Sequence, residues 1–561
     1  MFTYFILKKE LMAQFFKNIE IENIWYKWVW IATLPNGKKL LISGSVIPHA
    51  TVTCCIIKKR KDFIQAKLIA ITAYKWQKID ETIFETFPEL QKPACAHYNN
   101  PLVHEQPEQE PTTWCGWCKR QILSEWHQGA IKMWLFENIR ENAPYIHNVH
   151  MHDMLLAPDA YYYRNKIEFS FGKYISGWEH PQNNHRQMGF HKQWFFSKVV
   201  DVERCHLIDD DMHTVFETIK QLCKESWLPV HDQKTHEWFF RHLVIRHGKN
   251  TWHMLINLVI ADKQLTTPIA QTLRKELQDI FLSHKDLKKL VTSFCITTNN
   301  WLADIVRWQD TTTRNLRWDW YMYEHLEFWD SAHTNMSLEQ QDNTHVSYIM
   351  EDWQAKAQQT TQQKQQSVKD SWPKVAKFRI SPFSFFQTNT RAAEMLFAQA
   401  ASILWKSWWV MFDIYCGTGS IWISMLKLNK ADQIIGIEIV PEAIIDAQYN
   451  AKINAVQDQT YFVAGKAEEL VHSDPRIQQA LTTVQTIVVD PPRDGLHKNV
   501  IKFLNTLKQQ HQCKLLYISC NPVTMRRDAD LLIEWGRKLT TLQPIDMFPQ
   551  THHLETIWLF L

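Results

Sequence analysis

Apolar and polar residues alternate in short runs through the N-terminal part of the chain, a pattern typical of half-buried β-strands. The turn-forming sequence PNG at residues 35–37 separates two of these runs, and Gly44 follows another. Short strands joined by tight turns predict a small OB-like β-barrel over residues 16–75. The clearest runs span residues 29–33, 39–42, 50–57 and 63–70.

The pattern is less regular over residues 76–375, which we predict to form a central α+β domain. Between residues 331 and 372 the chain turns polar and rich in Gln, which predicts an inserted helical or disordered excursion. The strand-like runs of this region are residues 166–171, 198–202 and 242–246.

Strand-like and helical segments alternate from residue 376 to residue 561. Such alternation predicts a doubly wound, Rossmann-like parallel sheet, in which ligands bind at the carboxyl ends of the strands. The fold class predicted for the whole chain is therefore multidomain α/β. The strand-like runs of the C-terminal domain are residues 409–415, 434–439, 461–464, 486–489 and 514–519.

Length and charge add only a little to this prediction of fold and binding partners. A chain of 561 residues exceeds one domain of roughly 150 residues, and a net charge of +3 confines any nucleic-acid surface to a local patch. The basic run at residues 58–61 (KKRK) is such a patch, although a solvated loop explains it equally well. No apolar stretch approaches the ~20 residues of a membrane span. The N-terminus lacks the features of a signal peptide, so we expect a cytoplasmic protein.

The chain contains 11 cysteines at uneven spacings. Secreted disulfide frameworks are usually short chains with regularly spaced cysteines. The pattern here instead favours metal-binding or catalytic thiols in a reducing compartment.

A glycine-containing turn follows the first strand of the C-terminal domain, at residues 413–420 (DIYCGTGS). Glycines let the backbone approach a ligand closely, and the absence of a phosphate-binding lysine excludes a P-loop. The next strand ends in Glu438, whose carboxylate can accept hydrogen bonds from ribose hydroxyls. These features fit a dinucleotide as well as S-adenosylmethionine.

Two further strand ends carry reactive side chains: Asp490 in the sequence DPPR and Cys520 in the sequence SCNP. Adjacent strand ends should bring both into one cleft. Amino-group methylases carry an aromatic residue at the position of Arg493, so this combination favours methylation of carbon. A thiolate that adds to C6 of a uracil makes C5 nucleophilic, and a base such as Glu555 must then remove the C5 proton.

Two of these residues also fit simpler roles. Cys520 could be an inert cysteine of a buried strand. Arg493 could steer a phosphate or lower the pKa of the thiol, or it could form an ordinary surface ion pair.

With residues 378–389 (FRISPFSFFQTN) and 546–549 (DMFP), these motifs resemble the RNA 5-methyluridine methyltransferases over nearly the full chain, in particular the iron–sulfur type that modifies 23S ribosomal RNA. The resemblance implies Cys520 as nucleophile and Glu555 as base. It also implies a monomer without a membrane partner that binds RNA through an N-terminal TRAM domain. The RNA is ribosomal, with transfer RNA as the alternative. The implied S-adenosylmethionine site comprises Gln387, Tyr415, Ser420, Glu438 and Asp490.

The same resemblance implies a four-iron, four-sulfur cluster. Cys115 and Cys118 form a CxxC pair that suits a soft metal. The separation between Cys95 and Cys115 exceeds the usual spacing of the family, so zinc remains the alternative. The implied ligands are Cys95, Cys115, Cys118 and Cys205.

Tryptophan is unusually frequent and glycine unusually rare, with 26 Trp and 14 Gly. Several tryptophans stand where related sequences carry glycine, and a large ring cannot replace hydrogen at a position of positive φ. Our hypothesis is that the gene uses UGA for glycine and was translated with UGA as tryptophan; UGG codons at these positions would contradict it. If the tryptophans are genuine, a catalytically impaired RNA-binding or RNA-folding protein is the alternative. The positions are Trp25, Trp28, Trp30, Trp117, Trp194, Trp252, Trp422 and Trp535.

Overall fold

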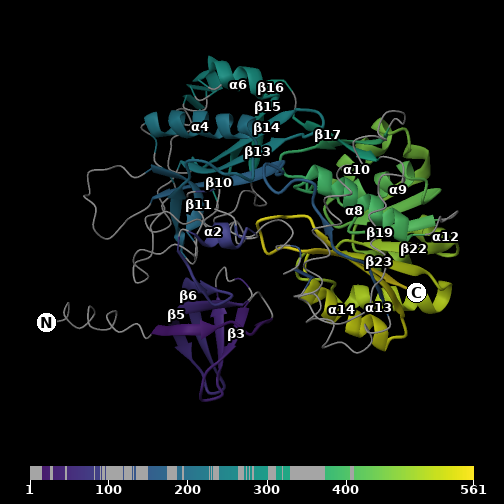
Figure 1. Cartoon of the computed structure of the whole chain (residues 1–561). Helices are drawn as coiled ribbons and strands as arrows, with labels where there is room; N and C mark the ends of the chain where they lie inside the picture. Colours follow the sequence, from purple (N-terminus) through teal and green to yellow (C-terminus); the bar gives the residue numbers. More distant parts are fainter. Residues whose placement is uncertain are drawn as a thin grey trace, which may run out of the picture.

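The computed structural model describes most of the chain, and Figure 1 shows its arrangement. Cys115, Trp28, Trp117, Trp194 and the Gln-rich residues 331–372 lie outside the described residues. The described residues are 15–25, 29–43, 47, 49–80, 82–88, 90, 95, 118, 129, 132–133, 149–173, 186–192, 195–226, 228, 230, 239–262, 271–272, 275–276, 278–280, 283–300, 311–318, 320–328, 373–404 and 410–561.

The N-terminal strands form one sheet, drawn in purple in Figure 1, in the order β1-β5-β6-β4-β3-β2, with β7 beside β6. All pairs are antiparallel except β4 and β6. Strands occupy all four predicted runs, and Trp30 is fully buried in their core. Closure into a barrel stays a prediction. The strands are β1 (Phe15–Glu20), β2 (Asn23–Trp25), β3 (Val29–Thr33), β4 (Lys39–Ser43), β5 (Ala50–Lys59), β6 (Phe63–Tyr74) and β7 (Gln77–Lys78).

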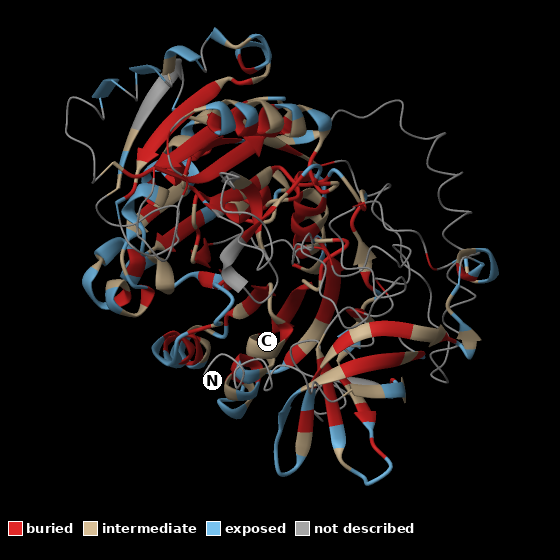
Figure 2. Cartoon of the chain, turned by 90° about the vertical axis from the view of Figure 1, so that its left-hand side faces the viewer, coloured by how far each residue is buried: buried red, intermediate tan, exposed pale blue. Residues whose placement is uncertain are grey.

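The central sheet has the order β12-β11-β10-β13-β14-β15-β16. Every residue of β13 and β14 is buried, and the red strands of Figure 2 mark this core. Helix α4 packs Phe216 against Phe169 of β10. The elements are β10 (Lys166–Lys173), β11 (Arg186–Lys192), β12 (Phe195–Asp201), α4 (Asp210–Glu225), β13 (Phe240–His247), β14 (Met254–Ile260), α6 (Lys285–Leu290), β15 (Ser293–Thr298) and β16 (Thr312–Trp318), preceded by the short helix α2 (Ile83–Thr86).

An antiparallel ribbon of β17 (Met322–Phe328) and β18 (Lys374–Ile380) leads from the central sheet into the C-terminal domain. Buried Glu324 of β17 accepts hydrogen bonds from the backbone N–H groups of Lys249 (2.6 Å) and Asn250 (3.2 Å). It also accepts one from the hydroxyl of Thr390 (3.0 Å). This carboxyl group therefore joins the loop between β13 and β14 to the first helix of the C-terminal domain.

The C-terminal sheet has the order β21-β20-β19-β22-β23-β25-β24-β8, and the first five strands are parallel. Strands occupy all five predicted runs. The fold is a mixed α/β arrangement of several sheets. The elements are α8 (Thr390–Ile403), β19 (Val410–Ile414), α9 (Ser420–Lys427), β20 (Gln433–Glu438), α10 (Pro441–Ile453), η4 (Gln457–Gln459), β21 (Thr460–Ala464), α11 (Ala467–Ser473), α12 (Pro475–Leu481), β22 (Val484–Val489), α13 (Lys498–His511), β23 (Lys514–Ser519), α14 (Pro522–Glu534), β24 (Leu539–Asp546) and β25 (Glu555–Phe560).

Helices cover both faces of this sheet, as the alternation of its side chains requires. Leu516 and Ile518 of β23 belong to the hydrophobic cluster that contains α8, α9 and α10. Leu515 and Tyr517, on the opposite face of the same strand, belong to the cluster that contains α13 and α14. Strands with two buried faces read as continuous apolar runs, which explains why the sequence pattern identified them.

Residues from the central part of the chain complete this sheet. β8 (His150–Met151) and β9 (Leu155–Leu156) both pair in parallel with β24. Local sequence pattern contains no signal for such a long-range pairing. Among the described helices, none has both the length and the hydrophobicity that crossing a membrane requires.

A two-residue turn joins β6 to β7, and both of its residues have positive φ: Lys75 at 47° and Trp76 at 69°. This conformation belongs to a type I′ turn, where Gly is preferred at the second position. Trp76 is 80% exposed, so its ring gains little packing in return.

We predict that Trp76→Gly raises the free energy of unfolding by about 1 kcal/mol, because it relieves a left-handed conformation without removing buried surface. Chemical denaturation followed by circular dichroism measures this change. Trp535→Gly is the control, since Trp535 is an exposed tryptophan whose φ is −92°. Equal destabilisation by both variants would contradict the prediction.

Candidate active site

The glycine turn lies at the carboxyl ends of β19 and β20. Tyr415 (φ 70°), Gly417 (53°) and Gly419 (89°) all adopt positive φ, and α9 begins at the next residue, Ser420. The carboxylate of Glu438 accepts a hydrogen bond from the backbone N–H of Gly417 (3.1 Å). The structure therefore brings together three of the predicted cofactor residues, Tyr415, Ser420 and Glu438.

Gln387 lies in the loop between β18 and α8 and is buried. Its backbone carbonyl accepts a hydrogen bond from the side-chain amide of Asn165 (2.9 Å), at the start of the central sheet. In the same loop, the carbonyl of Phe385 accepts a hydrogen bond from the hydroxyl of Thr418 (3.3 Å). These contacts hold the loop of Gln387 against the glycine turn.

Asp413 is a site residue that the sequence interpretation missed. Its side chain is fully buried, and neither carboxyl oxygen has a hydrogen-bond partner. Burial raises the pKa of Asp413 well above its ordinary value, and the neighbouring Asp490 and Glu438 raise it further. A carboxyl group inside the apolar strand VMFDI was the available signal. Three carboxyl groups at adjacent strand ends favour a cationic ligand.

Cys520, Asp490 and Glu555 lie at the ends of three neighbouring strands. Asp490 follows β22, Cys520 follows β23, and Glu555 is the first residue of β25, whose Thr556 pairs with Ser519. The structure therefore brings the predicted nucleophile, the predicted base and Asp490 to one edge of the sheet.

Glu555 is buried and Cys520 and Asp490 are half-buried beside it, and this shifts the pKa values of all three groups. Burial, followed by Glu555 and Asp490, raises the pKa of Cys520 to about 12, whereas Arg493 opposes the shift. Burial raises the pKa of Asp490 to about 7. Burial and Asp490 raise the pKa of Glu555 well above its ordinary value. The Oε2 atom of Glu555 is buried without a hydrogen-bond partner.

The guanidinium of Arg493 provides a positive charge near Cys520 and Glu555. Its guanidinium lies 3.1 Å from Nε2 of His553. Burial, His552 and Arg493 lower the pKa of His553 to about 2, so the imidazole is neutral and accepts the hydrogen bond. Arg493 is exposed on its other side, and it acts electrostatically on both Cys520 and Glu555. A simple surface ion pair does not account for this position.

Residues of the central region fix the segment that precedes Glu555. Lys132 is fully buried, forms an ion pair with Asp546, and donates to the carbonyl of Phe548 (3.2 Å). The hydroxyl of Tyr163 donates to the carbonyl of Pro549 (3.0 Å). Sequence interpretation missed these contacts because they join segments far apart in the chain.

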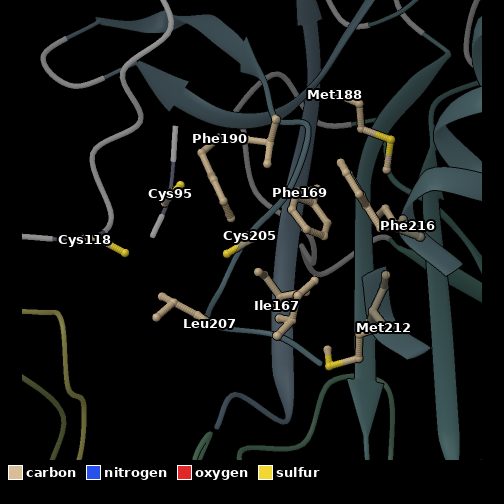
Figure 3. Packing of buried hydrophobic residues seen from close by; sticks show 14 of the residues in the cluster. Cys95, Cys118, Ile167, Phe169, Met188, Phe190, Cys205, Leu207, Met212 and Phe216 are labelled. Carbon is tan, nitrogen blue, oxygen red and sulfur yellow. The ribbon is translucent and has the colours of Figure 1, made fainter. Parts of the chain in front are cut away.

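Three of the four predicted cluster ligands lie close in the fold. Figure 3 shows Cys95, Cys118 and Cys205 on one side of a packed apolar cluster. All three are buried, and the thiol of Cys95 lies 3.8 Å from the carbonyl oxygen of Arg204. Cys115, the fourth, is outside the described residues. Among the residues that are described, no group of three or more His, Cys, Asp or Glu side chains is arranged to hold a metal ion.

Trp422 packs directly behind the glycine turn. A Cβ atom at Gly419 would lie 2.2 Å from its indole Nε1. The ring is fully buried against Phe462 (centroids 4.4 Å apart), and Nε1 has no hydrogen-bond partner. A buried, unsatisfied N–H is costly, which fits the idea that a smaller residue belongs at this position. Of the other tryptophans in this set, Trp252 (φ 59°) and Trp535 are exposed, whereas Trp30 is fully buried.

In comparisons with known proteins, the C-terminal part of the chain matches one protein family. Residues 320–561 match the family described as tRNA (uracil-5-)-methyltransferase. An uncharacterized RNA methyltransferase of Clostridium acetobutylicum is 28% identical over 543 residues, which cover 96% of this chain and 95% of the relative. One of Chlorobaculum tepidum is 26% identical over 536 residues, with coverages of 93% and 92%.

The fold of the whole chain resembles that of a solved structure. The Pyrococcus abyssi tRNA (uracil-54, C5)-methyltransferase in complex with S-adenosyl-L-homocysteine aligns with a TM-score of 0.59 and 18% sequence identity. The alignment covers 97% of this chain and 100% of that chain.

We predict that Cys520 in the ligand-free protein reacts slowly with iodoacetamide at pH 7.5, because a pKa of about 12 leaves little thiolate. The rate should rise about tenfold per pH unit between pH 7 and 9. Arg493→Gln should slow the reaction further, since it removes the charge that lowers the thiol pKa. Peptide mass spectrometry measures the rate, and the urea-unfolded protein is the control. A rate independent of pH above 7 would contradict this prediction.

Proposed function

We propose that this chain, an RNA uracil-5 methyltransferase, transfers a methyl group from S-adenosylmethionine to C5 of a specific uridine in 23S ribosomal RNA. The observation that supports this most strongly is the convergence of Cys520, Glu555 and Asp490 at one strand edge. A half-buried thiol beside a buried carboxyl group supplies the two groups that this reaction needs, a nucleophile and a base.

In the proposed mechanism, Cys520 and Glu555 first release their protons to water. The Cys520 thiolate then adds to C6 of the uracil, and the electron pair of the C5–C6 double bond forms an enolate across C5, C4 and the C4 oxygen. C5 then takes the methyl group, which S-adenosylmethionine supplies as an electrophile. Glu555 removes the C5 proton, and the electron pair of that C–H bond restores the double bond as the C6–S bond breaks. Arg493 stabilises the thiolate before addition and after release.

The residues that we propose to hold S-adenosylmethionine surround the glycine turn. Glu438 is positioned for ribose hydroxyls, while Gln387, Tyr415 and Ser420 border the same turn. Asp490 links this site to Cys520. Asp413 adds a buried carboxyl group whose free oxygens suit a positively charged ligand.

RNA is the proposed partner, and the N-terminal sheet is its proposed TRAM-type binding module. The basic run at residues 58–61 is exposed at the hairpin between β5 and β6, where it can contact phosphates. The target base must also leave its stack to reach Cys520. Transfer RNA is the alternative substrate, and a catalytically impaired RNA-binding or RNA-folding protein is the alternative function.

We also propose a four-iron, four-sulfur cluster on Cys95, Cys115, Cys118 and Cys205. The CxxC pair of Cys115 and Cys118 supports it. Cys95, Cys118 and Cys205 are buried in one hydrophobic cluster, but as they stand they are not arranged to hold a metal ion. Cysteine thiolates suit both iron–sulfur clusters and zinc. Metal analysis of anaerobically purified protein should therefore find iron and sulfide that decrease in Cys205→Ala, whereas zinc would support the alternative.

We predict that the purified protein transfers labelled methyl groups to C5 of uridine in 23S ribosomal RNA. Cys520→Ala should abolish transfer while methyl-donor binding persists, because the thiol contacts only the uracil. Glu555→Gln should accumulate a covalent protein–RNA adduct and lower turnover at least ~1000-fold, since the C5 proton cannot leave. Nucleoside analysis and denaturing gels measure these outcomes.

Cys513→Ala is the matched control, because Cys513 lies just before the opposite end of the same strand, β23. It should retain turnover within about twofold of the wild type. Transfer to transfer RNA alone would replace the ribosomal assignment with the alternative substrate. RNA binding without any transfer would support the impaired protein.

A further inference from the structure

The loop that follows β22, residues 490–496, is bound at Arg493, Asp494 and Leu496 to helix α14 and its N-cap residue. Helix α14 begins two residues after Cys520. The carbonyl of Arg493 accepts hydrogen bonds from the side-chain amide of Asn521 (3.0 Å) and the hydroxyl of Thr524 (3.1 Å). One turn later, the guanidinium of Arg527 donates to the carbonyl of Asp494 (2.9 Å). The loop that carries Arg493 therefore depends on α14 for its position.

A single carboxylate, Asp528, joins this loop to both elements that flank Cys520. It is fully buried, and its Oδ2 accepts hydrogen bonds from the backbone N–H of Leu496 (2.7 Å) and the hydroxyl of Tyr517 (2.8 Å). Its Oδ1 accepts from Nε of Arg527 (2.9 Å), which balances the buried charge. Tyr517 lies in β23, three residues before Cys520. Asp528 thus connects the strand, the helix and the loop.

The loop also fits closely around this carboxylate. Gly495 has a φ of 77°, and its N–H donates to the carbonyl of Pro492 (2.8 Å). A Cβ atom at Gly495 would lie 2.5 Å from Oδ2 of Asp528 and 2.6 Å from Nη2 of Arg527. Only glycine allows the loop to approach the Asp528–Arg527 pair in this conformation.

The position of the loop matters because of Arg493. Its guanidinium acts on both Cys520 and Glu555. The interaction between charges depends on their separation and weakens as water enters. Arg493 is exposed on its outer side and bonded to His553, so its own side-chain contacts do not fix its backbone.

We propose that Asp528, with Tyr517 and Arg527, is a positioning residue that holds the loop of Arg493 at a fixed distance from Cys520 and Glu555. This inference rests on the proposed function. Asp528 contacts neither substrate nor reacting atoms and acts through Arg493.

Tyr517→Phe and Asp528→Asn test the proposal in the full-length protein. Each should lower the single-turnover rate of methyl transfer roughly 10- to 100-fold and leave the dissociation constant of the methyl donor within about threefold. The pH at half-maximal rate should rise, because the thiolate loses stabilisation. In the Arg493→Gln background neither substitution should lower the rate further, because all act through one group.

Tyr461→Phe and Asp474→Asn are the matched controls. Tyr461 donates a hydrogen bond to Asp474 (2.7 Å) in the same domain, close to the Tyr517–Asp528 distance but at β21 and the start of α12. These substitutions remove a hydrogen bond of the same kind at a less buried position, and they should leave the pH profile unchanged.

Three results would overturn the proposal: effects of Tyr517→Phe that add to those of Arg493→Gln, an unchanged pH profile, or the same kinetic change in the controls. If Asp528→Asn does not fold, Tyr517→Phe decides alone. If the wild type transfers no methyl group, the proposed function fails separately. The iodoacetamide reaction of Cys520 then replaces the turnover assay: slowing by Tyr517→Phe supports the positioning role, and an unchanged rate overturns it.

Discussion

The candidate site depends on one electrostatic constraint: buried Glu555 and half-buried Cys520 and Asp490 lie together at the ends of β22, β23 and β25. Like charges in a low-dielectric site cannot all ionise, so Cys520 and Glu555 favour their neutral forms in the ligand-free protein. Arg493 is the cation that opposes this shift. The surrounding structure therefore serves to keep one guanidinium close to groups that must lose and gain protons in turn.

Several parts of the chain cooperate in this arrangement. The central region supplies Lys132 and Tyr163, which hold the segment before Glu555, and Asn165, which holds the loop of Gln387. β8 and β9 extend the C-terminal sheet on the same side. Residues of the central region therefore hold two segments of the site in place, and the C-terminal domain does not form the complete site by itself.

Sequence pattern predicted the parts of this architecture that depend on local chemistry. The parallel strands are buried on both faces and read as apolar runs, and the rule that parallel strand ends converge predicted that Asp490 and Cys520 lie together. The rule does not cover Glu555, which begins the antiparallel strand β25. Asp413 was missed because its carboxyl group lies within an apolar run. Asp528 and Lys132 were missed because their partners are distant in sequence. Trp76 shows the same limit, since its positive φ appears only in the folded turn.

The central claim is that Cys520 forms a covalent bond to C6 of the uracil. The most direct measurement is the mass of protein incubated with S-adenosylmethionine and 5-fluorouridine-substituted RNA, whose C5 carries no proton for Glu555 to remove. We expect a stable, methylated protein–RNA adduct, with nuclease-trimmed peptides that map the attachment to Cys520. Methyl transfer without an adduct, or an adduct at another residue, would contradict this mechanism.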